Sequence, residues 1–170
     1  MSMMSIRTAT PRDRDAIREV EEHAFGQKAE AGLVDALVAN GDTVLELVAE
    51  EDGAVVGHIL FSRLYVQSGV SQYPAVALAP LAVEPSFHKS GIGGALVREA
   101  HIRLKDAGET LSIVLGEPAY YGRFGYSHER AAGFASDYQC EALQALAWSA
   151  EAPVEGALVY APPFGTDLAA

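Results

Sequence analysis

Apolar and polar positions alternate along several short stretches of the chain, and each such stretch predicts a β-strand. The predicted strands cover residues 5–9, 44–50, 54–61 with an extension to about 66, 75–83, 111–115 and 156–160. Asp52-Gly53 joins two of these stretches, and this pair is typical of a two-residue hairpin turn. Pro80 lies inside the fourth stretch, where its missing N–H predicts a bulge or an interruption of pairing. Residues 67–74 are rich in turn formers and predict a break between strands.

Other stretches place their apolar residues three and four positions apart, which predicts helices. The predicted helices cover residues 11–25, 29–39, about 92–106, 118–121, and a final helix that begins with a capping box at 136–139 and reaches Trp148. Thr10 and Pro11 supply the cap and first position of the first helix, and Gly26 ends it. The resulting order is strand, two helices, hairpin, interrupted strand, helix, strand, short helix and strand. This order predicts an α+β protein with a mixed sheet.

Composition restricts the class of protein. The chain has 170 residues, which fits a single domain over residues 1–170. Cys140 is the only cysteine, so no internal disulfide forms and a reducing cytoplasm is expected. The start of the chain does not resemble a signal peptide, and no apolar run reaches the length of a membrane helix. The formal net charge of −11 argues against a nucleic-acid partner.

The most informative segment follows the fourth predicted strand. Gly91, Gly93 and Gly94 stand just before a helix-forming run. Glycines let the backbone adopt positive φ and approach a ligand closely. A helix that begins there directs free N–H groups and the positive end of its dipole toward an anion. The segment therefore predicts a phosphate or pyrophosphate site.

Two common phosphate motifs match this segment poorly. A nucleotide P-loop needs Gly-Lys-Ser/Thr at the helix start, whereas this chain has Gly93-Gly94-Ala95. A dinucleotide fingerprint needs a third glycine where Leu96 stands, and it directly follows a strand, whereas seven residues separate Val83 from Gly91. A nicotinamide-dependent oxidoreductase is nevertheless kept as an alternative function, because half of that fingerprint is present.

The run His88-Lys89-Ser90-Gly91-Ile92-Gly93 resembles motif A of the GNAT acetyltransferase family, whose pattern is Gln/Arg-x-x-Gly-x-Gly/Ala. His88 departs from that pattern at its first position. Residues 121–126 resemble the family's Tyr-x-x-x-Gly-Phe segment, and residues 115–121 resemble a Leu-Gly-Asp/Glu-Pro-x-Tyr-Tyr run of a bacterial subgroup of predicted N-acetyltransferases. The order of elements also matches over nearly the whole chain. The resemblance implies a mixed, mostly antiparallel sheet with a splayed fourth and fifth strand pair and helices on both faces.

The resemblance also implies that acetyl-CoA is the co-substrate, with no metal. Strand residues beyond Pro80 would pair with the pantetheine arm as if it were an added strand, and the glycine loop would hold the pyrophosphate. The residues expected to bind acetyl-CoA are Leu81, Ala82, Val83, His88, Lys89, Ser90, Gly91, Ile92, Gly93, Gly94 and Ala95.

The chemistry implied by the family is direct attack of a primary amine on the thioester in a ternary complex. Tyr121 matches the family's general-acid position. A phenol, with an ordinary pKa of about 10, is protonated at neutral pH and so carries a proton that a departing thiolate, whose thiol pKa is about 8.5, can take up. Tyr120 is the competing candidate. Glu84 follows the pantetheine strand and is taken as the candidate base, with Glu117 and the pair Glu22 and His23 as alternatives.

The acceptor is expected to be a small-molecule or peptide amine, with no nucleic-acid or membrane partner. If the protein forms an oligomer, a homodimer is expected, because homodimers are the commonest oligomers. His58, within a predicted strand, is interpreted as a structural histidine with satisfied hydrogen bonds. Another class of function also stays open, namely a GNAT-like module that binds CoA or acyl-CoA without transferring the acyl group.

Overall fold

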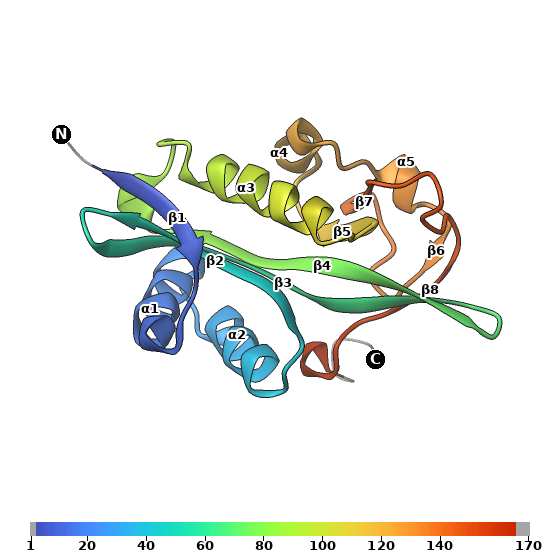
Figure 1. Ribbon diagram of the computed structural model, residues 1–170, viewed down its shortest axis with the longest axis horizontal. Helices are drawn as coiled ribbons and strands as arrows, with labels where there is room; N and C mark the ends of the chain where they lie inside the picture. Colours follow the sequence, from blue (N-terminus) through green and yellow to red (C-terminus); the bar gives the residue numbers. More distant parts are fainter. Residues whose placement is uncertain (1–2, 166–170) are drawn as a thin grey trace. The chain divides into compact units, whose positions relative to one another are not determined.

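The computed structural model describes residues 3–165, which form two compact units that share strands β3 and β4. The first unit comprises the residues up to Phe61 together with Ala79–Arg103, and the second comprises Ser62–Leu78 and the residues from Leu104 onward. The strands are β1 (Met4–Thr8), β2 (Thr43–Glu51), β3 (Ala54–Ser68), β4 (Ser71–Val83), β5 (Leu111–Leu115), β6 (Phe134–Ala135), β7 (Leu143–Ala147) and β8 (Gly156–Val159). The α-helices are α1 (Arg14–Phe25), α2 (Ala29–Ala39), α3 (Ile92–Asp106), α4 (Pro118–Tyr121) and α5 (His128–Ala131) (Figure 1).

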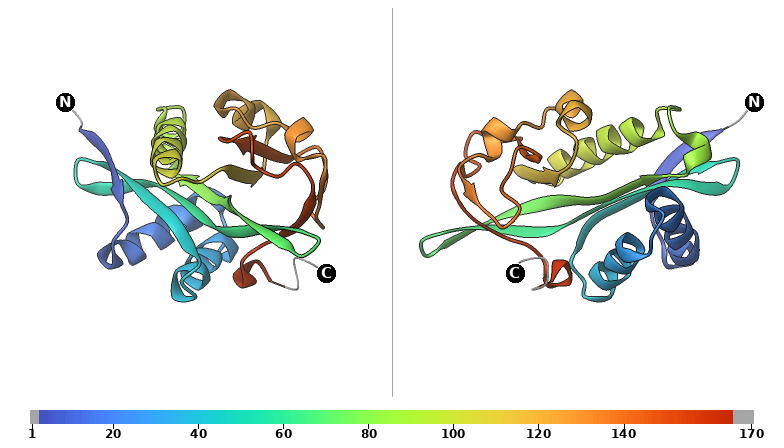
Figure 2. Two further views of the ribbon diagram at one scale, coloured as in Figure 1. Left: turned by 45° about the vertical axis from the view of Figure 1, so that its right-hand side comes forward. Right: turned by 180° about the vertical axis from the view of Figure 1, so that it is seen from behind.

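In the first unit the strand order is β1-β2-β3-β4. β1 runs antiparallel to β2, with Met4 opposite Glu51 and Thr8 opposite Leu47. The predicted Asp52-Gly53 turn is present, and both residues have positive φ, 52° and 86°, as a two-residue turn that follows the twist of the strands requires. α1 and α2 cover one face of these strands and α3 covers the other (Figures 1 and 2).

In the second unit the strand order is β3-β4-β5-β7, and β8 pairs with both β3 and β6. β5 runs parallel to β4 and antiparallel to β7. The paired residues of β4 and β5 are Val76–Leu78 and Ser112–Val114, and the peptide bond between Ala79 and Pro80 is cis. A buried apolar cluster fills this unit, built from Leu64, Val66, Ala75, Ala77, Leu111, Ile113, Ala131, Phe134, Leu143, Ala145 and Ala152.

Two boundaries differ from the sequence predictions. β3 and β4 meet at a tight turn around Gly69, so β4 begins at Ser71 and the predicted break over 67–74 is mostly strand. The first helix begins with a 3₁₀ turn over Pro11–Asp13 before α1. That turn is fixed because the Asp13 carboxylate accepts from the Thr10 N–H at 2.7 Å and from two guanidinium nitrogens of Arg7 at 2.8 and 2.9 Å.

The helix predicted from Ser136 to Trp148 is wrong. Ser136 does begin a turn, since its Oγ accepts from the Tyr138 N–H at 3.1 Å and its carbonyl accepts from Gln139 at 3.1 Å. The chain then continues as β7, which pairs with all five residues of β5. Pairing along β5 and burial of Leu143 and Ala145 outweigh the local helix signal.

Candidate active site

The loop between β4 and α3 contains the predicted anion site and lies within the first unit. The first bond inside α3 joins the Ala95 N–H to the Gly91 carbonyl at 3.0 Å. The N–H groups of Ile92, Gly93 and Gly94 precede that bond, so the helix offers them no acceptor. Lys89 and Gly91 both have positive φ, 69° and 86°. A Cβ at Gly91 would meet no atom within 4 Å, so glycine is needed there for its φ rather than for space.

Other N–H groups of the loop already have acceptors. The His88 N–H donates to the Pro85 carbonyl at 3.2 Å, and the Ser90 N–H donates to the Phe87 carbonyl at 3.2 Å. The Ser90 hydroxyl also donates to Phe87. The backbone N–H groups of Lys89–Ala95 were predicted to bind the anion. Because Ser90 and Ala95 donate to other carbonyls, the groups that stay candidates for this role are those of Lys89 and Gly91–Gly94.

Gly57 on β3 sets the position of the start of α3. A Cβ at Gly57 would stand 2.9 Å from Ile92 Cγ2 and 3.0 Å from Leu96 Cδ1. The helix therefore packs directly on bare backbone, and both of these side chains are almost fully buried. The Gly57 contact was not foreseen, although an isolated glycine inside a strand signals a close approach.

The end of β4 presents one edge to β3 and leaves the other for the expected pantetheine arm. The Glu84 N–H donates to the Val56 carbonyl at 2.8 Å. Because backbone groups alternate along a strand, Ala82 faces β3 like Glu84, whereas Leu81 and Val83 face the opposite edge. Of the three residues predicted to contact a pantetheine arm, Leu81 and Val83 are thus the ones whose backbone groups face away from β3. The Val83 carbonyl accepts from His88 Nε2 at 2.9 Å.

Glu84, the candidate base, forms an ion pair with His23 at the end of α1. His23 Nδ1 lies 2.7 Å from Oε1 and 3.1 Å from Oε2 of Glu84. The hydrogen bond to this carboxylate raises the pKa of His23 above its ordinary value. Glu84 and His23 were predicted as alternative candidates for the base, and the structure brings the two side chains together.

Tyr121, the candidate general acid, lies in the second unit on the short helix α4. A Cβ at Gly116 would stand 2.5 Å from Tyr121 Cε2, so the phenol ring rests on bare backbone. Burial raises the pKa of Tyr121 to about 12, with a smaller contribution from Tyr120. The phenol is therefore protonated throughout the neutral range and is able to donate a proton.

The neighbouring aromatic residues have different surroundings. Tyr120 stacks edge-on against Phe124 at 5.4 Å between ring centroids, and the Arg123 guanidinium lies 4.7 Å from the centre of the Tyr120 ring. The Tyr126 hydroxyl lies 2.8 Å from Ser112 Oγ, and burial raises its pKa. Sequence reasoning missed the Ser112–Tyr126 pair because nothing in the local pattern marks it.

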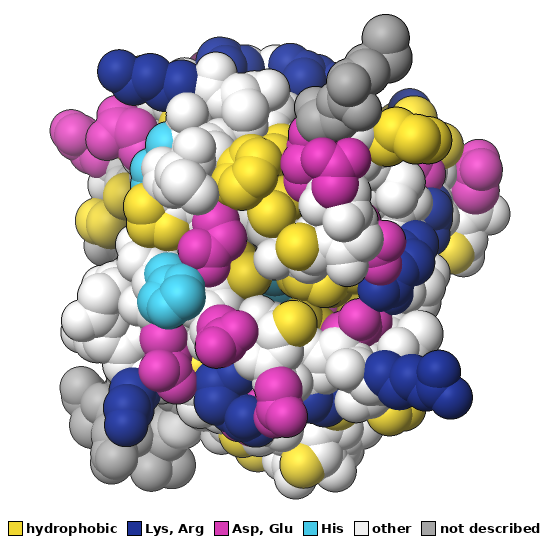
Figure 3. All heavy atoms as spheres, turned by 90° about the vertical axis from the view of Figure 1, so that its left-hand side faces the viewer, with side chains coloured by type: hydrophobic (Ala, Val, Ile, Leu, Met, Phe, Trp, Pro, Cys, Tyr) yellow, Lys and Arg dark blue, Asp and Glu magenta, His cyan; other side chains and the backbone are white. Residues whose placement is uncertain are grey.

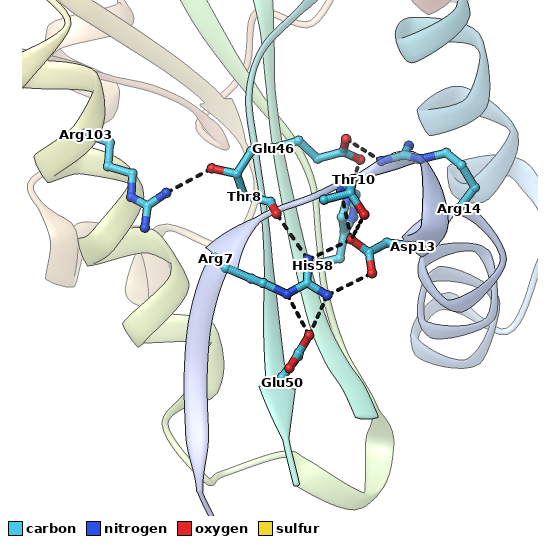
Figure 4. Close-up of polar contacts among 9 residues, drawn as sticks. All are labelled: Arg7, Thr8, Thr10, Asp13, Arg14, Glu46, Glu50, His58 and Arg103. Atoms are coloured by element: carbon cyan, nitrogen blue, oxygen red, sulfur yellow. Dashed lines mark hydrogen bonds and ion pairs between the residues drawn. The ribbon is translucent and has the colours of Figure 1, made fainter. Parts of the chain in front are cut away.

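A buried charge network lies between α1 and strands β2 and β3 in the first unit. His58 is fully buried, and its Nδ1 donates to Glu21 at 2.6 Å. Its Nε2 donates to Glu46 at 2.7 Å, and Arg14 donates to Glu46 at 2.5 Å (Figure 4). The interpretation of His58 as a satisfied structural histidine is confirmed. Its acidic partners were not predicted, because they are far from it in sequence.

These contacts set the protonation of the network. Burial alone would lower the pKa of His58, but its hydrogen bonds to Glu21 and Glu46 raise it above its ordinary value. Burial raises the pKa of Glu21. For Glu46, burial acts upward, but the hydrogen bonds from His58 and Arg14 leave the pKa below its ordinary value. Both imidazole nitrogens lie within hydrogen-bonding distance of a carboxyl group, and these two contacts favour the cationic form of His58.

Charge at the surface is mainly negative. Asp and Glu side chains are spread over the face shown in Figure 3, with histidine side chains among them, in keeping with the net charge of −11. Within residues 3–165 no group of three or more metal-binding side chains is found, and no helix is both long and apolar enough to cross a membrane.

The chain belongs to the GNAT acetyltransferase family and is an acyltransferase. The family model described as "Acetyltransferase (GNAT) domain" matches residues 5–128. Among curated proteins, the Escherichia coli (strain K12) protein YjhQ is 40% identical over 116 residues, which cover 67% of this chain and 64% of YjhQ, a little under two thirds. YhbS of the same strain is 38% identical over 124 residues, which cover 72% of this chain and 73% of YhbS. Both carry the name uncharacterized N-acetyltransferase.

Two solved structures share the fold over nearly the whole chain. A GNAT acetyltransferase from Brucella melitensis, crystallised with acetyl-CoA, has 36% sequence identity and a TM-score of 0.81, covering 95% of this chain and 98% of that one. YhbS from Escherichia coli, crystallised with CoA, has 30% identity and a TM-score of 0.89, covering 96% and 93%. These structures confirm the predicted α+β fold with its mixed, mostly antiparallel sheet.

Proposed function

We propose that this chain is a single-domain N-acetyltransferase that transfers an acetyl group from acetyl-CoA to a primary amine by direct attack in a ternary complex. The observation that carries the proposal is the loop before α3, where the backbone N–H groups of Ile92, Gly93 and Gly94 precede the first bond of a 15-residue helix. The acetyl-CoA and CoA complexes of the two structural relatives support the same ligand.

The loop residues fit a pyrophosphate. Unpaired N–H groups at a helix start bind anions through hydrogen bonds and through the helix dipole. Lys89 stands in the middle of this loop and adds a positive charge to a protein that is otherwise acidic. Gly57 fixes the start of the helix by letting Ile92 and Leu96 pack against β3. The proposed pyrophosphate site therefore comprises Lys89 and Gly91–Gly94.

The outward edge of β4 fits the pantetheine arm. Leu81 and Val83 direct their backbone groups away from β3, and an amide-bearing chain can pair there as an added strand. Because Val83 is the residue of this edge closest to the loop, an arm that starts at the pyrophosphate runs from Val83 back toward Leu81. The thioester then lies on the Leu81 side of the arm.

The proposed reaction needs three proton movements. The ammonium group loses one proton to the base, its nitrogen bonds to the thioester carbonyl carbon, and the C–S bond breaks. The departing thiolate takes up a proton from an acid, and the nitrogen loses its second proton, which returns to that acid through water. We assign protonation of the thiolate to Tyr121. Support comes from its match to the family motif, and burial, which raises the pKa of Tyr121 to about 12, keeps the phenol protonated at neutral pH.

Glu84 is proposed as the base, acting together with His23. Its carboxylate is 2.7 Å from His23 Nδ1, so a His23 that is neutral before the reaction can take up the proton and form the ion pair with Glu84. Glu84 lies at the loop end of β4, so a proton from the amine reaches it through water. The acceptor is proposed to be a small-molecule or peptide amine in the cytoplasm, without a nucleic-acid or membrane partner, because the surface is acidic.

The experiment that tests this proposal is a thiol-release assay with acetyl-CoA and a panel of primary amines, with the product mass confirmed by mass spectrometry. The proposal predicts release of CoA thiol that depends on the amine, together with a mass gain of one acetyl group on that amine. Binding of acetyl-CoA without transfer to any amine would instead favour a CoA-binding module. Quenching of nicotinamide fluorescence without CoA binding would favour an oxidoreductase.

A further inference from the structure

The Val83 carbonyl is the backbone acceptor of the outward β4 edge that lies closest to the proposed pyrophosphate site. The His88 side chain is hydrogen-bonded to it. Val83 faces the outward edge of β4, because Glu84, the next residue, donates its N–H to Val56 of β3 at 2.8 Å. On that outward edge His88 Nε2 donates to the Val83 carbonyl at 2.9 Å. The imidazole therefore lies where the first amide N–H of an added strand would bond.

The backbone of the loop fixes this arrangement. Pro85–Phe87 form a 3₁₀ turn in which the Phe87 N–H donates to the Glu84 carbonyl at 2.8 Å and the His88 N–H donates to Pro85 at 3.2 Å. The turn reverses the chain so that the His88 side chain reaches back to the strand end. Lys89, with φ of 69°, then redirects the backbone into the glycines.

His88 is also the residue at which the chain departs from the family pattern of Gln or Arg. Its side chain is exposed, so it is free to swing outward without disturbing the core. The bond to Val83 is a hydrogen bond to a neutral carbonyl, which contributes only about 1 kcal/mol net. A ligand that offers its own N–H to Val83 is able to replace it.

We propose that His88 is a displaceable plug of the pantetheine edge: acetyl-CoA binding exchanges the His88–Val83 hydrogen bond for one between an amide of the arm and Val83. This inference rests on the proposed use of acetyl-CoA. It identifies His88 as a residue that sets the affinity for the arm of the ligand rather than for its pyrophosphate.

The test compares two probes by calorimetry. Acetyl-CoA carries the pantetheine arm, whereas adenosine 3′-phosphate 5′-diphosphate carries the pyrophosphate without it. In His88→Ala the competitor is removed, so the dissociation constant of acetyl-CoA is expected to fall about fivefold, the equivalent of one neutral hydrogen bond. The dissociation constant of the armless probe is expected to change by less than about twofold, since it does not reach Val83.

His128→Ala is the matched control, because His128 Nδ1 donates to the Leu143 carbonyl at 3.0 Å in the second unit; both affinities should stay as in the wild type. Thermal melting checks that each variant is folded. Equal changes in the dissociation constants of the two probes, or weaker acetyl-CoA binding in His88→Ala, would overturn the proposal that acetyl-CoA displaces His88 from Val83. A crystal structure of the acetyl-CoA complex with the His88–Val83 bond intact would overturn it as well. If the wild type bound neither probe, the proposed function itself would fail.

Discussion

The ring of Tyr121 rests directly on the backbone of Gly116, where a methyl group would stand 2.5 Å from Cε2 and 3.0 Å from Cδ2 of the ring. Gly116 itself is held in place, because its N–H donates to the Ala142 carbonyl at 3.0 Å and its carbonyl accepts from Gln144 at 3.1 Å. Because these bonds hold the Gly116 backbone in place, a side chain at this position would push the Tyr121 ring away. The position of the phenol therefore depends on residue 116 being glycine.

Gly116→Ala should therefore displace Tyr121. We expect turnover with the best amine to fall at least tenfold, because a proton donor that is misplaced by about 1 Å loses much of its effect, while acetyl-CoA affinity changes little. Steady-state kinetics and calorimetry measure the two quantities. Gly122→Ala is the control, since a Cβ at Gly122 meets nothing within 4 Å. Wild-type turnover in Gly116→Ala would contradict this role of Gly116.

Tyr121→Phe removes the proposed acid while keeping the ring. We expect kcat to fall by roughly 10²–10⁴-fold, the usual contribution of a general acid, with acetyl-CoA affinity unchanged. Because burial raises the Tyr121 pKa to about 12, the phenol stays protonated well above neutral pH and wild-type kcat should not decline between pH 7 and 10 on its account. Tyr120→Phe should keep most of the activity. A larger loss in Tyr120→Phe than in Tyr121→Phe would exchange the two assignments.

The position of Tyr121 in the chain could be predicted, but its surroundings could not. Its distance from Gly125 follows from the motif, which is local in sequence. Its ring contacts Gly116 and packs edge-on against Tyr126, with 5.9 Å between the ring centroids. These contacts depend on how the backbone turns after β5, and no periodic pattern encodes that turn. The glycine loop shows the same limit. The local sequence predicted that its backbone N–H groups bind an anion, but it could not predict that the N–H groups of Ser90 and Ala95 donate to carbonyls of the chain itself.

Lys89 has a left-handed backbone, with φ of 69°, which costs a non-glycine residue about 1 kcal/mol. Lys89→Gly should leave the free energy of unfolding within about 1 kcal/mol of wild type, since the relief of strain is offset by a more flexible unfolded chain. Acetyl-CoA binding should weaken roughly threefold to tenfold at low salt, with a smaller difference at high salt. Lys89→Arg keeps the charge and should bind normally. Equal affinity of Lys89→Gly and wild type at low salt would remove Lys89 from the site.

His58→Gln should be strongly destabilising. It leaves Glu21 buried without its cationic partner and Glu46 with Arg14 alone, and breaking a buried ion pair costs about 3–5 kcal/mol. The folded-state pKa of His58 lies above its ordinary value, so its stabilisation is fully present below about pH 6.5 and is lost as pH rises through the folded pKa. Urea unfolding at pH 6 and pH 9 should show a larger difference between wild type and variant at pH 6. A difference that grew with pH would contradict the cationic state of His58.

Glu84→Gln should lower the pKa of His23. The hydrogen bond to the Glu84 carboxylate is the largest cause of its elevation, so without that charge the imidazole should titrate nearer the ordinary value of about 6.5. The titration of the His23 ring protons by NMR measures this directly. Glu22→Gln, which removes a charge that is not hydrogen-bonded to His23, should have a smaller effect. An unchanged His23 pKa in Glu84→Gln would show that the pair does not form in solution.

Much of the fold follows from the sequence because its signals are local. The Asp52-Gly53 hairpin, the helix over 29–39 and the strand over 111–115 were predicted at or near their observed boundaries. The predicted helix over 136–148 failed for a non-local reason: β7 pairs along the whole of β5, and that pairing is invisible in the local pattern. The buried network around His58 was missed in the same way, since Glu21 and His58 are 37 positions apart.

The loop before α3 is proposed to bind acetyl-CoA, and a calorimetric titration of the wild-type protein with acetyl-CoA tests this most directly. We expect saturable heat from one site per chain, and we expect adenosine 3′-phosphate 5′-diphosphate, which carries the same pyrophosphate without the arm, to compete for that site. Absence of binding heat at millimolar acetyl-CoA would show that the loop does not bind this ligand.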